Sequence, residues 1–197
     1  MKRFVNESWL VLVMGVVFAC LLAGAQTSLE ARIRENHDRA LNDAIAEVVP
    51  DEATMETLTV DGNTVYKCLD KDGNLAGWAV DAMGTGFMDK IRLVTGLSPD
   101  GSRITGIKVI EDLETPGLGN KIEGPWAYQY KGLDASRKIE VVKGKANHNN
   151  NEIEAITGAT YSSTYVTDIV NDVIERIRPQ LAEHREPSSS GSVRERE

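Results

Sequence analysis

The pattern of apolar and polar positions begins with an uninterrupted apolar run near the N-terminus. Residues 9–25, WLVLVMGVVFACLLAGA, form a stretch of 17 residues without a charged or strongly polar side chain. A helix of this length lies at the short limit of what crosses the hydrocarbon core of a bilayer. The pattern therefore predicts a single transmembrane anchor, and we assign a cytoplasmic N-terminus and this anchor to residues 1–27.

The charges that flank the apolar run predict its orientation. Lys2 and Arg3 precede it, and the tendency of positive residues to stay inside places the N-terminus in the cytoplasm and the rest of the chain outside. The alternative is a cleaved signal peptide, for which the small residues at 23–25 offer a cleavage site. Both interpretations export the remainder of the chain.

After the anchor, apolar residues recur at helical spacing. Residues 27–30, TSLE, have the form of a capping box, and the helical periodicity continues from there to Val49-Pro50. This pattern predicts a separate juxtamembrane helix over residues 28–50. It can be a stalk that sets the distance between a domain and the membrane, or an ordinary amphipathic helix that packs on a sheet. We expect it to combine both roles.

Between residues 57 and 142 the pattern changes to period two, with frequent Gly, Asn, Asp and Pro turn signals. Five short runs rich in β-branched residues predict an antiparallel meander: TLTV, TVYKCL, LAGWAVDA, IRLVTGL and ITGIKVIE. An apolar stripe at residues 166–177 predicts a helix that Pro179 bends or ends. The predicted fold class is therefore α+β: a transmembrane helix and a stalk helix, then an antiparallel sheet domain with flanking helices over residues 51–183. A disordered tail is expected over residues 184–197.

Composition narrows the classes of function. With 41 % apolar residues the chain can bury a core, and a net charge of -8 without clustered basic residues argues against a nucleic-acid partner. Cys68 is the one cysteine beyond the apolar run, so an exported domain has no internal disulfide and no cysteine cluster for a metal. His37, His148 and His184 stand among polar neighbours and fit solvated surface residues better than metal ligands. We therefore expect no metal site, and we assign no catalytic residue.

The stretch IEAITGATYSS at residues 153–163 places a tight turn directly before the last helical pattern. Gly158 and Ala159 are small enough to let the backbone approach a bulky group. A helix that begins here would offer free N–H groups and a partial positive charge to a phosphate. In a simpler interpretation, Thr160 or Ser162 caps the helix and the glycine only permits the turn. Taken alone, the stretch favours the simpler interpretation.

A second stretch of small residues, ETPGLG at residues 114–119, follows the run ITGIKVIE. Such a loop can lay its backbone flat against a planar ligand, with a hydroxyl from Thr115 and an apolar contact from Leu118. It can also be an ordinary turn in which Pro116 and the glycines have their usual conformational role. Neither stretch identifies a ligand by itself.

In combination and in this order, the two stretches resemble the covalent FMN-binding domain family. The resemblance covers about residues 5–180 and includes GTGFMDKIRLVTGL at 84–97, ITGIKVIEDLETPGLG at 104–119 and IEAITGATYSS. Within the family, the chain is most similar to the G-type subunit (RnfG) of the Rnf ion-translocating electron transport complexes. The C-type subunit of the Na+-translocating NADH:quinone reductases is a near relative. Thr157 stands where many members have Ser, and Glu154 stands where an Asp is common.

The resemblance implies a covalent cofactor site. In this family the threonine that ends the [ST]-G-A-T motif carries FMN through a phosphoester. A flavin transferase that uses FAD and a divalent metal attaches it outside the cytoplasm. The matching residue here is Thr160. The resemblance also implies cofactor contacts from the two loops: Thr157, Gly158, Ala159, Glu114, Thr115, Gly117 and Leu118.

The resemblance further implies what the chain does. It would be an electron-transfer subunit in the cytoplasmic membrane, with its flavin passing electrons one at a time between neighbouring membrane subunits. The expected assembly is an Rnf-type complex that couples electron transfer between ferredoxin and NAD to translocation of Na+ or H+. No turnover is expected from this subunit alone. The alternatives are a component like the C-type subunit of a Na+-translocating NADH:quinone reductase, or a membrane-anchored binding module without redox chemistry.

Overall fold

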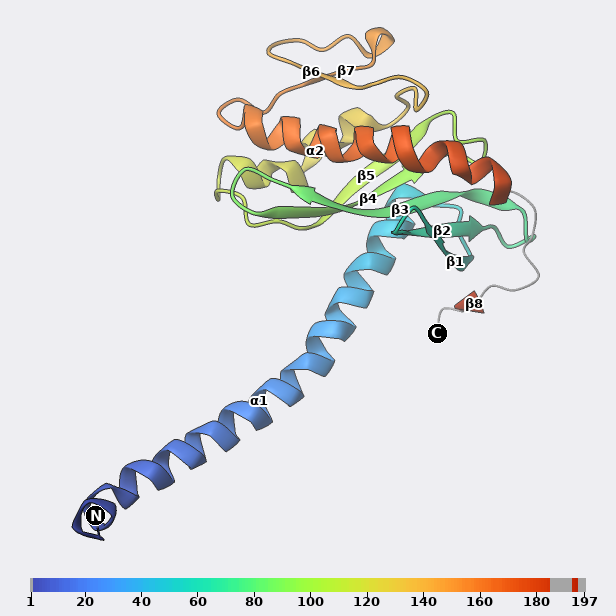
Figure 1. Cartoon of the computed structure of the whole chain (residues 1–197). Coiled ribbons are helices and arrows are strands. Elements are labelled where there is room, and N and C mark those ends of the chain that lie inside the picture. Colours follow the sequence, from blue (N-terminus) through green and yellow to red (C-terminus); the bar gives the residue numbers. More distant parts are fainter. Residues whose placement is uncertain (1, 185–192, 195–197) are drawn as a thin grey trace. The chain divides into compact units, whose positions relative to one another are not determined.

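The structure is a computed structural model that describes residues 2–184 and 193–194. The chain forms two compact units, residues 1–40 and 41–197. The first unit holds most of helix α1 (Lys2–Val48), and the second holds the end of α1 together with a sheet domain (Figure 1).

Helix α1 is continuous through the position where the sequence predicted a second helix to begin. The backbone at residues 27–30 is already helical, so the expected capping box does not start an element, and that expectation is wrong. The end of the helix is as predicted, because Pro50 disfavours the α conformation at Val49 and α1 stops at Val48. Over the residues that the structure describes, no helix combines the length and the hydropathy needed to cross a membrane.

Five strands follow α1 and form the predicted antiparallel meander: β1 (Thr54–Val60), β2 (Asn63–Leu69), β3 (Leu75–Thr85), β4 (Lys90–Leu97) and β5 (Ile104–Glu111). The sheet order is β5-β4-β3-β2-β1-β8 (Figure 1). Strand β8 (Val193–Arg194) pairs with the outer edge of β1, within the range predicted as a disordered tail. Residues 185–192 and 195–197 of that range lie outside the described part of the chain.

The turns between the strands use the residues that the sequence indicated. In the β1-β2 hairpin, Asp61 and Gly62 have φ values of 47° and 78°. Both lie in the left-handed region that a two-residue hairpin turn requires, and Gly and Asp reach it at lower cost than most residues. Between β2 and β3, the carboxylate of Asp70 accepts the backbone N–H groups of Asp72 and Asn74 at 2.9 and 2.8 Å.

The chain after β5 contains short elements and then a long helix. Its elements are 3-10 helices at Gly119–Glu123, Pro125–Tyr130 and His148–Asn150, strands β6 (Glu140–Val142) and β7 (Glu152–Glu154), which pair in parallel, and helix α2 (Thr160–Asp172). Helix α2 continues as a π-helical turn, Val173–Ile177, and a 3-10 helix, Arg178–His184. The change of winding follows from Pro179, which has no N–H for the carbonyl of Glu175 and whose ring clashes with it. The α-helical part of this segment ends at Asp172, and the chain stays helical through Pro179 in the 3-10 helix.

Alternating side chains of the strands fill two hydrophobic cores on opposite faces of the sheet. On β3, Trp78 and Val80 belong to the larger core, which α2 completes, while Ala79 belongs to the smaller one. The smaller core is completed by Leu41, Ala44, Ile45 and Val48 at the end of α1 and by Val49 directly after it. Successive side chains of a strand point to opposite faces, and here a helix covers each face of the sheet.

Cys68 lies fully buried in the smaller core, and this burial raises the pKa of its thiol from 9.0 to about 12. Because the thiolate is the reactive form, we expect no alkylation by iodoacetamide at pH 8 in the folded protein and complete alkylation after unfolding in guanidinium. The contribution of this thiol to stability is complete below about pH 9 and is lost as the pH rises towards 12, because the folded-state pKa is the higher one. Mass spectrometry of a Cys20→Ser variant measures the reaction, and rapid alkylation of the native protein would contradict the burial.

Candidate functional site

The TGAT loop, residues 157–160, turns sharply and leads directly into α2. Gly158 has a φ of 84°, in the left-handed region that residues with side chains rarely adopt. A Cβ atom at this position would also lie 3.3 Å from Cδ2 of Leu118. Backbone conformation and packing therefore both favour glycine here.

The N-terminus of α2 has no side-chain cap. Ala159 is the N-cap residue, with φ -137° and ψ 43°, and no side chain accepts a hydrogen bond there. Thr160 is the first residue of the helix and Ser162 the third, so the expectation that one of them caps it is wrong. The physical reason is that the turn at Gly158 leaves only Ala159 to join loop and helix. The first N–H groups of α2, with their partial positive charge, are therefore not used by a capping side chain.

The hydroxyl groups at the start of α2 differ in their partners. Ser162, Ser163 and Thr164 each donate a hydrogen bond to a protein oxygen, at 2.6, 3.1 and 2.9 Å. Oγ1 of Thr160 has no such bond within the described part of the chain, and its residue is half-buried. Among the serines and threonines of this turn, Thr160 therefore carries the hydroxyl that is available for reaction.

The ETPGLG loop, residues 114–119, lies against the TGAT loop. Gly117 has a φ of 77°, and its N–H donates to Oδ1 of Asn120 at 2.8 Å. The N–H of Leu118 donates to the carbonyl of Thr115 at 3.1 Å. These bonds close a tight turn that places the half-exposed side chain of Leu118 beside Gly158.

A small cavity of about 130 Å³ lies where the two loops and α2 meet. Its walls are formed by Phe87, Thr115, Leu118, Gly119, Gly158, Ala159, Thr160, Tyr161 and Ser162. Five of the residues expected to bind the cofactor are therefore brought together: Thr115, Leu118, Gly158, Ala159 and Thr160. The other three, Thr157, Gly117 and Glu114, do not line this cavity.

Two aromatic residues at the cavity were not predicted as part of the site. The rings of Phe87 and Tyr161 stack with their centroids 5.8 Å apart and an interplanar angle of 18°, and both side chains are more than half exposed. Phe87 comes from the β3-β4 turn and Tyr161 from α2. Their sequence signals were weak, because Phe87 and Tyr161 each lie within a longer motif and neither belongs to an apolar pattern of its own.

Side chains from the second 3-10 helix hold the segment that leads into the TGAT loop. Gln129 accepts the N–H of Glu154 at 2.8 Å and donates to its carbonyl at 3.3 Å. Nε1 of Trp126 donates to the same carbonyl at 2.6 Å. The backbone of Glu154 is thus fixed as in a paired strand, which positions the turn that follows.

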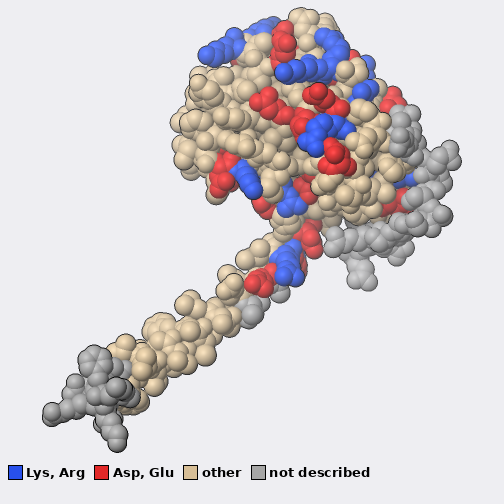
Figure 2. Space-filling view, in the orientation of Figure 1, with Lys and Arg blue, Asp and Glu red and all other residues tan. Residues whose placement is uncertain are grey.

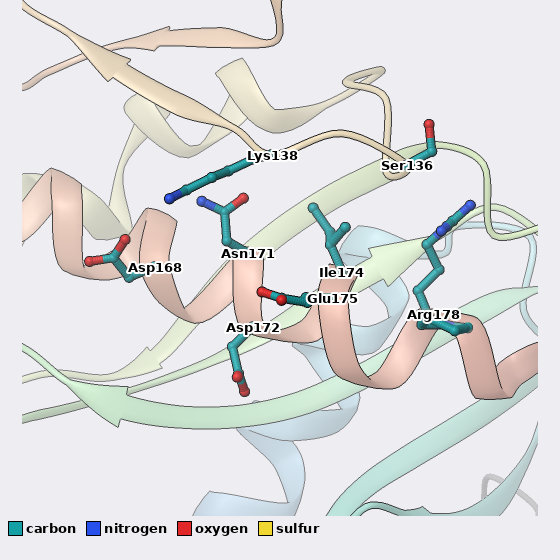
Figure 3. A pocket seen from close by; sticks show the side chains of 9 residues that line it. Ser136, Lys138, Asp168, Asn171, Asp172, Ile174, Glu175 and Arg178 are labelled. Carbon is teal, nitrogen blue, oxygen red and sulfur yellow. The ribbon is translucent and has the colours of Figure 1, made fainter.

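Two larger cavities border α2, with volumes of about 570 and 320 Å³. In the larger one, Lys138 and Arg178 share the wall with the acidic residues Asp168, Asp172 and Glu175 (Figure 3). Because charges of both signs are spread along its wall, the wall favours no ligand of one charge. Neither cavity contains a residue from the two predicted loops, so the smaller cavity is the candidate site.

Comparison with known proteins shows the family to which this chain belongs. Residues 86–175 match the FMN-binding domain, a range that includes both loops and α2. The G-type subunit of the ion-translocating oxidoreductase complex of Methanosarcina acetivorans is 33 % identical over 176 residues, which cover 85 % of this chain and 91 % of the relative. The G-type subunit of the Na+-translocating ferredoxin:NAD+ oxidoreductase complex of Acetobacterium woodii is 43 % identical over 105 residues, covering 53 % of this chain and 50 % of that protein.

A solved structure shows the same fold. The C-type subunit of the Na+-translocating NADH-quinone reductase from Parabacteroides distasonis superimposes with a TM-score of 0.60 at 17 % identity, over 78 % of this chain and 94 % of that one. The resemblance found in the sequence is thus confirmed by domain, by homologous subunits and by fold. The chain belongs to the FMN-binding domain family and is homologous to the G-type subunits of ion-translocating oxidoreductase complexes.

Proposed function

We propose that this chain is a membrane-anchored electron-transfer subunit that carries FMN through a phosphoester bond to Oγ1 of Thr160. The observation that carries the proposal is the position of this hydroxyl. It lines the cavity between the two loops, has no hydrogen bond within the described residues and stands at the first position of an uncapped helix. An alcohol is what a phosphoester requires, and the neighbouring Ser162, Ser163 and Thr164 use theirs internally.

The start of α2 fits the phosphate of such a group. A phosphate on Thr160 would lie beside the first N–H groups of the helix, which the N-cap residue Ala159 leaves without a side-chain acceptor. The helix N-terminus stabilises negative charge through these donors and its dipole. The same end of α2 would then serve both to hold the reacting hydroxyl and to neutralise the charge that attachment brings.

The cavity fits only part of the flavin. At about 130 Å³ it is smaller than the roughly 300 Å³ or more that is typical of sites enclosing a drug-sized ligand. The exposed side chains of Phe87, Leu118 and Tyr161 provide an apolar and aromatic surface against which a planar ring can lie. A covalent bond makes complete enclosure unnecessary, which is consistent with so open a site.

When bound, FMN supplies reversible electron transfer, and the chain supplies attachment, orientation and charge compensation. We propose that the chain works with the other membrane subunits of an Rnf-type complex that couples ferredoxin and NAD chemistry to ion movement. One relative carries the name Na+-translocating and another, from Clostridium ljungdahlii, proton-translocating. The proposal therefore covers either ion, and it assigns no turnover to this subunit alone.

The proposed anchor rests on the apolar run at residues 9–25. The side chains that the structure describes here are exposed on the helix, among them Val11 at 72 %, Leu12 at 64 % and Leu22 at 68 %. In Figure 2 the corresponding part of α1 shows no charged side chain, whereas the visible face of the sheet domain mixes both signs. An apolar helix without a protein partner is stabilised by lipid. We propose a cytoplasmic N-terminus, with the FMN-binding domain on the outer side, where a flavin transferase attaches the cofactor.

The test is to express the full chain together with a flavin transferase and to examine it after denaturation. We expect yellow fluorescence in a denaturing gel, an intact mass increased by one FMN less one water, and a modified peptide that contains residues 157–160. A chain that stays dark although the transferase labels a known substrate would overturn the proposal in favour of a binding module without redox chemistry. Label on any other residue, including Thr157 of the same peptide, would overturn the assignment to Thr160.

A further inference from the structure

Glu114 is a buried carboxylate that joins three segments of the site. Its residue is 5 % exposed, and its Oε1 accepts the backbone N–H groups of Phe87 at 2.7 Å and Met88 at 3.1 Å. Its Oε2 accepts the hydroxyl of Ser162 at 2.6 Å. The partners lie 27, 26 and 48 positions away along the chain. One side chain therefore connects the β3-β4 turn, the ETPGLG loop and the first turn of α2.

Two glycines enclose this carboxylate. A Cβ atom at Gly86 would lie 2.6 Å from Oε1 of Glu114, and one at Gly119 would lie 2.8 Å from Oε2 and 2.8 Å from Oγ of Ser162. Neither glycine has a positive φ, so space, and not backbone conformation, explains the absence of a side chain at each. At Gly119 the space is taken by the Glu114 side chain and Oγ of Ser162, whereas at Gly86 the carbonyl oxygen of Asp89, at 2.5 Å, also excludes a side chain.

We propose that Glu114 is a positioning residue for flavin attachment and not a contact of the flavin. It does not line the cavity, but its partners Phe87 and Ser162 do. By holding both, it keeps the two loops and α2 in the arrangement that presents Thr160 to the transferase. This inference rests on the proposed function. In the step that it serves, the bond from Oγ1 of Thr160 to the flavin-side phosphorus of FAD forms, the diphosphate bond breaks, AMP leaves and the hydroxyl proton passes to solvent.

Two substitutions at Glu114 separate the effect of side-chain length from the effect of charge. Aspartate keeps the charge but is one methylene shorter, so it cannot reach the N–H of Phe87 and the hydroxyl of Ser162 together. Glutamine keeps the length: its carbonyl can accept both N–H groups while its NH2 group donates to Oγ of Ser162, which is also an acceptor. Gly119→Ala tests the same point without changing either partner, because the new Cβ displaces the carboxylate.

The experiment measures flavin attachment to the full chain in detergent by purified transferase with FAD and Mg2+, with the concentration of the chain varied. When only a fraction of a substrate protein is in the competent arrangement, its apparent affinity falls by that fraction while the rate at saturation is kept. We therefore expect Glu114→Asp and Gly119→Ala to raise KM about tenfold with kcat within about twofold. Glu114→Gln should stay near the wild type. Glu140→Gln, at an exposed position on β6, is the matched control.

Melting curves are recorded for each variant, so that labelling is compared at a temperature where all of them are folded. The inference is overturned if Glu114→Asp labels like the wild type, or if Glu114→Gln is as slow as Glu114→Asp. In both cases a labelled wild type leaves the proposed function standing. A wild type that takes no label contradicts the proposed function instead, so the two failures are distinguishable.

Discussion

Thr160→Ala will abolish covalent flavin attachment, whereas Thr160→Ser will retain it. Alanine has no oxygen to form the phosphoester, while serine offers the same hydroxyl at the first position of α2. The hydroxyls of Ser162 and Ser163 cannot replace it, because they are held by internal hydrogen bonds and their residues are 3 % and 0 % exposed. The measurement is in-gel fluorescence and intact mass of the full chain after co-expression with a transferase, with the loss expected to be complete.

The control for this prediction is Thr164→Val, which removes a nearby hydroxyl but keeps the branched shape of the side chain. The hydroxyl of Thr164 donates only to the carbonyl of Thr160, at 2.9 Å. Loss of the Thr164 hydroxyl should not reduce flavin labelling. Serine and threonine hydroxyls that bond back to the preceding helical turn add little to the stability of a helix. Equal label on Thr160→Ala and wild type would show that another residue is the acceptor.

Gly96→Ala will destabilise the sheet domain by about 2–3 kcal/mol, and the melting temperature should fall by roughly 5–10 °C. A Cβ atom at Gly96 would lie 2.7 Å from Cβ of Val48 and 2.9 Å from its carbonyl oxygen, and it would also clash with the hydroxyl of Thr105. The end of α1 is therefore packed directly on the backbone of β4. Because one of these contacts is backbone, a rotamer change cannot relieve it, and the helix end must move away from the sheet.

Gly106→Ala provides the matched control, because Gly106 pairs with Gly96 across β4 and β5. Its nearest neighbours would lie 3.7 Å or more from a new Cβ atom, which is ordinary contact. Its φ is not positive either, so we expect a change within about 0.5 kcal/mol. Thermal unfolding followed by circular dichroism measures both variants. Equal melting temperatures for the two would contradict the close packing of α1 on β4.

The sheet could be predicted well because its signals are local. Asp61 and Gly62 specify a two-residue hairpin whatever surrounds them, and the short β-branched runs on either side of such turns indicate antiparallel strands. The start of a helix is harder to predict from a local signal. Residues 27–30 match a capping box in composition, but a capping box is only needed where a helix begins, and α1 is already helical there. A local motif cannot report whether the element before it has ended.

The residues of the candidate site were predicted only in part. Both loops were identified from their small residues, and the structure brings Thr115, Leu118 and Thr160 to one cavity. The aromatic pair was missed because Phe87 and Tyr161 meet only through the fold. Glu114 was expected among the cofactor contacts, whereas the structure buries its carboxylate against partners up to 48 residues away. Such long-range partners leave no trace in local sequence spacing.

The small size of the cavity between the two loops affects what sets the cofactor occupancy of this protein. A site that encloses its ligand fills and empties with the concentration of that ligand, as a dissociation constant dictates. A cavity of about 130 Å³ encloses too little of a flavin to hold it in this way. With a phosphoester at Thr160, occupancy would instead record a single past event, the encounter of each chain with a transferase. Dilution, washing or scarcity of free flavin afterwards would leave the cofactor content of the population unchanged.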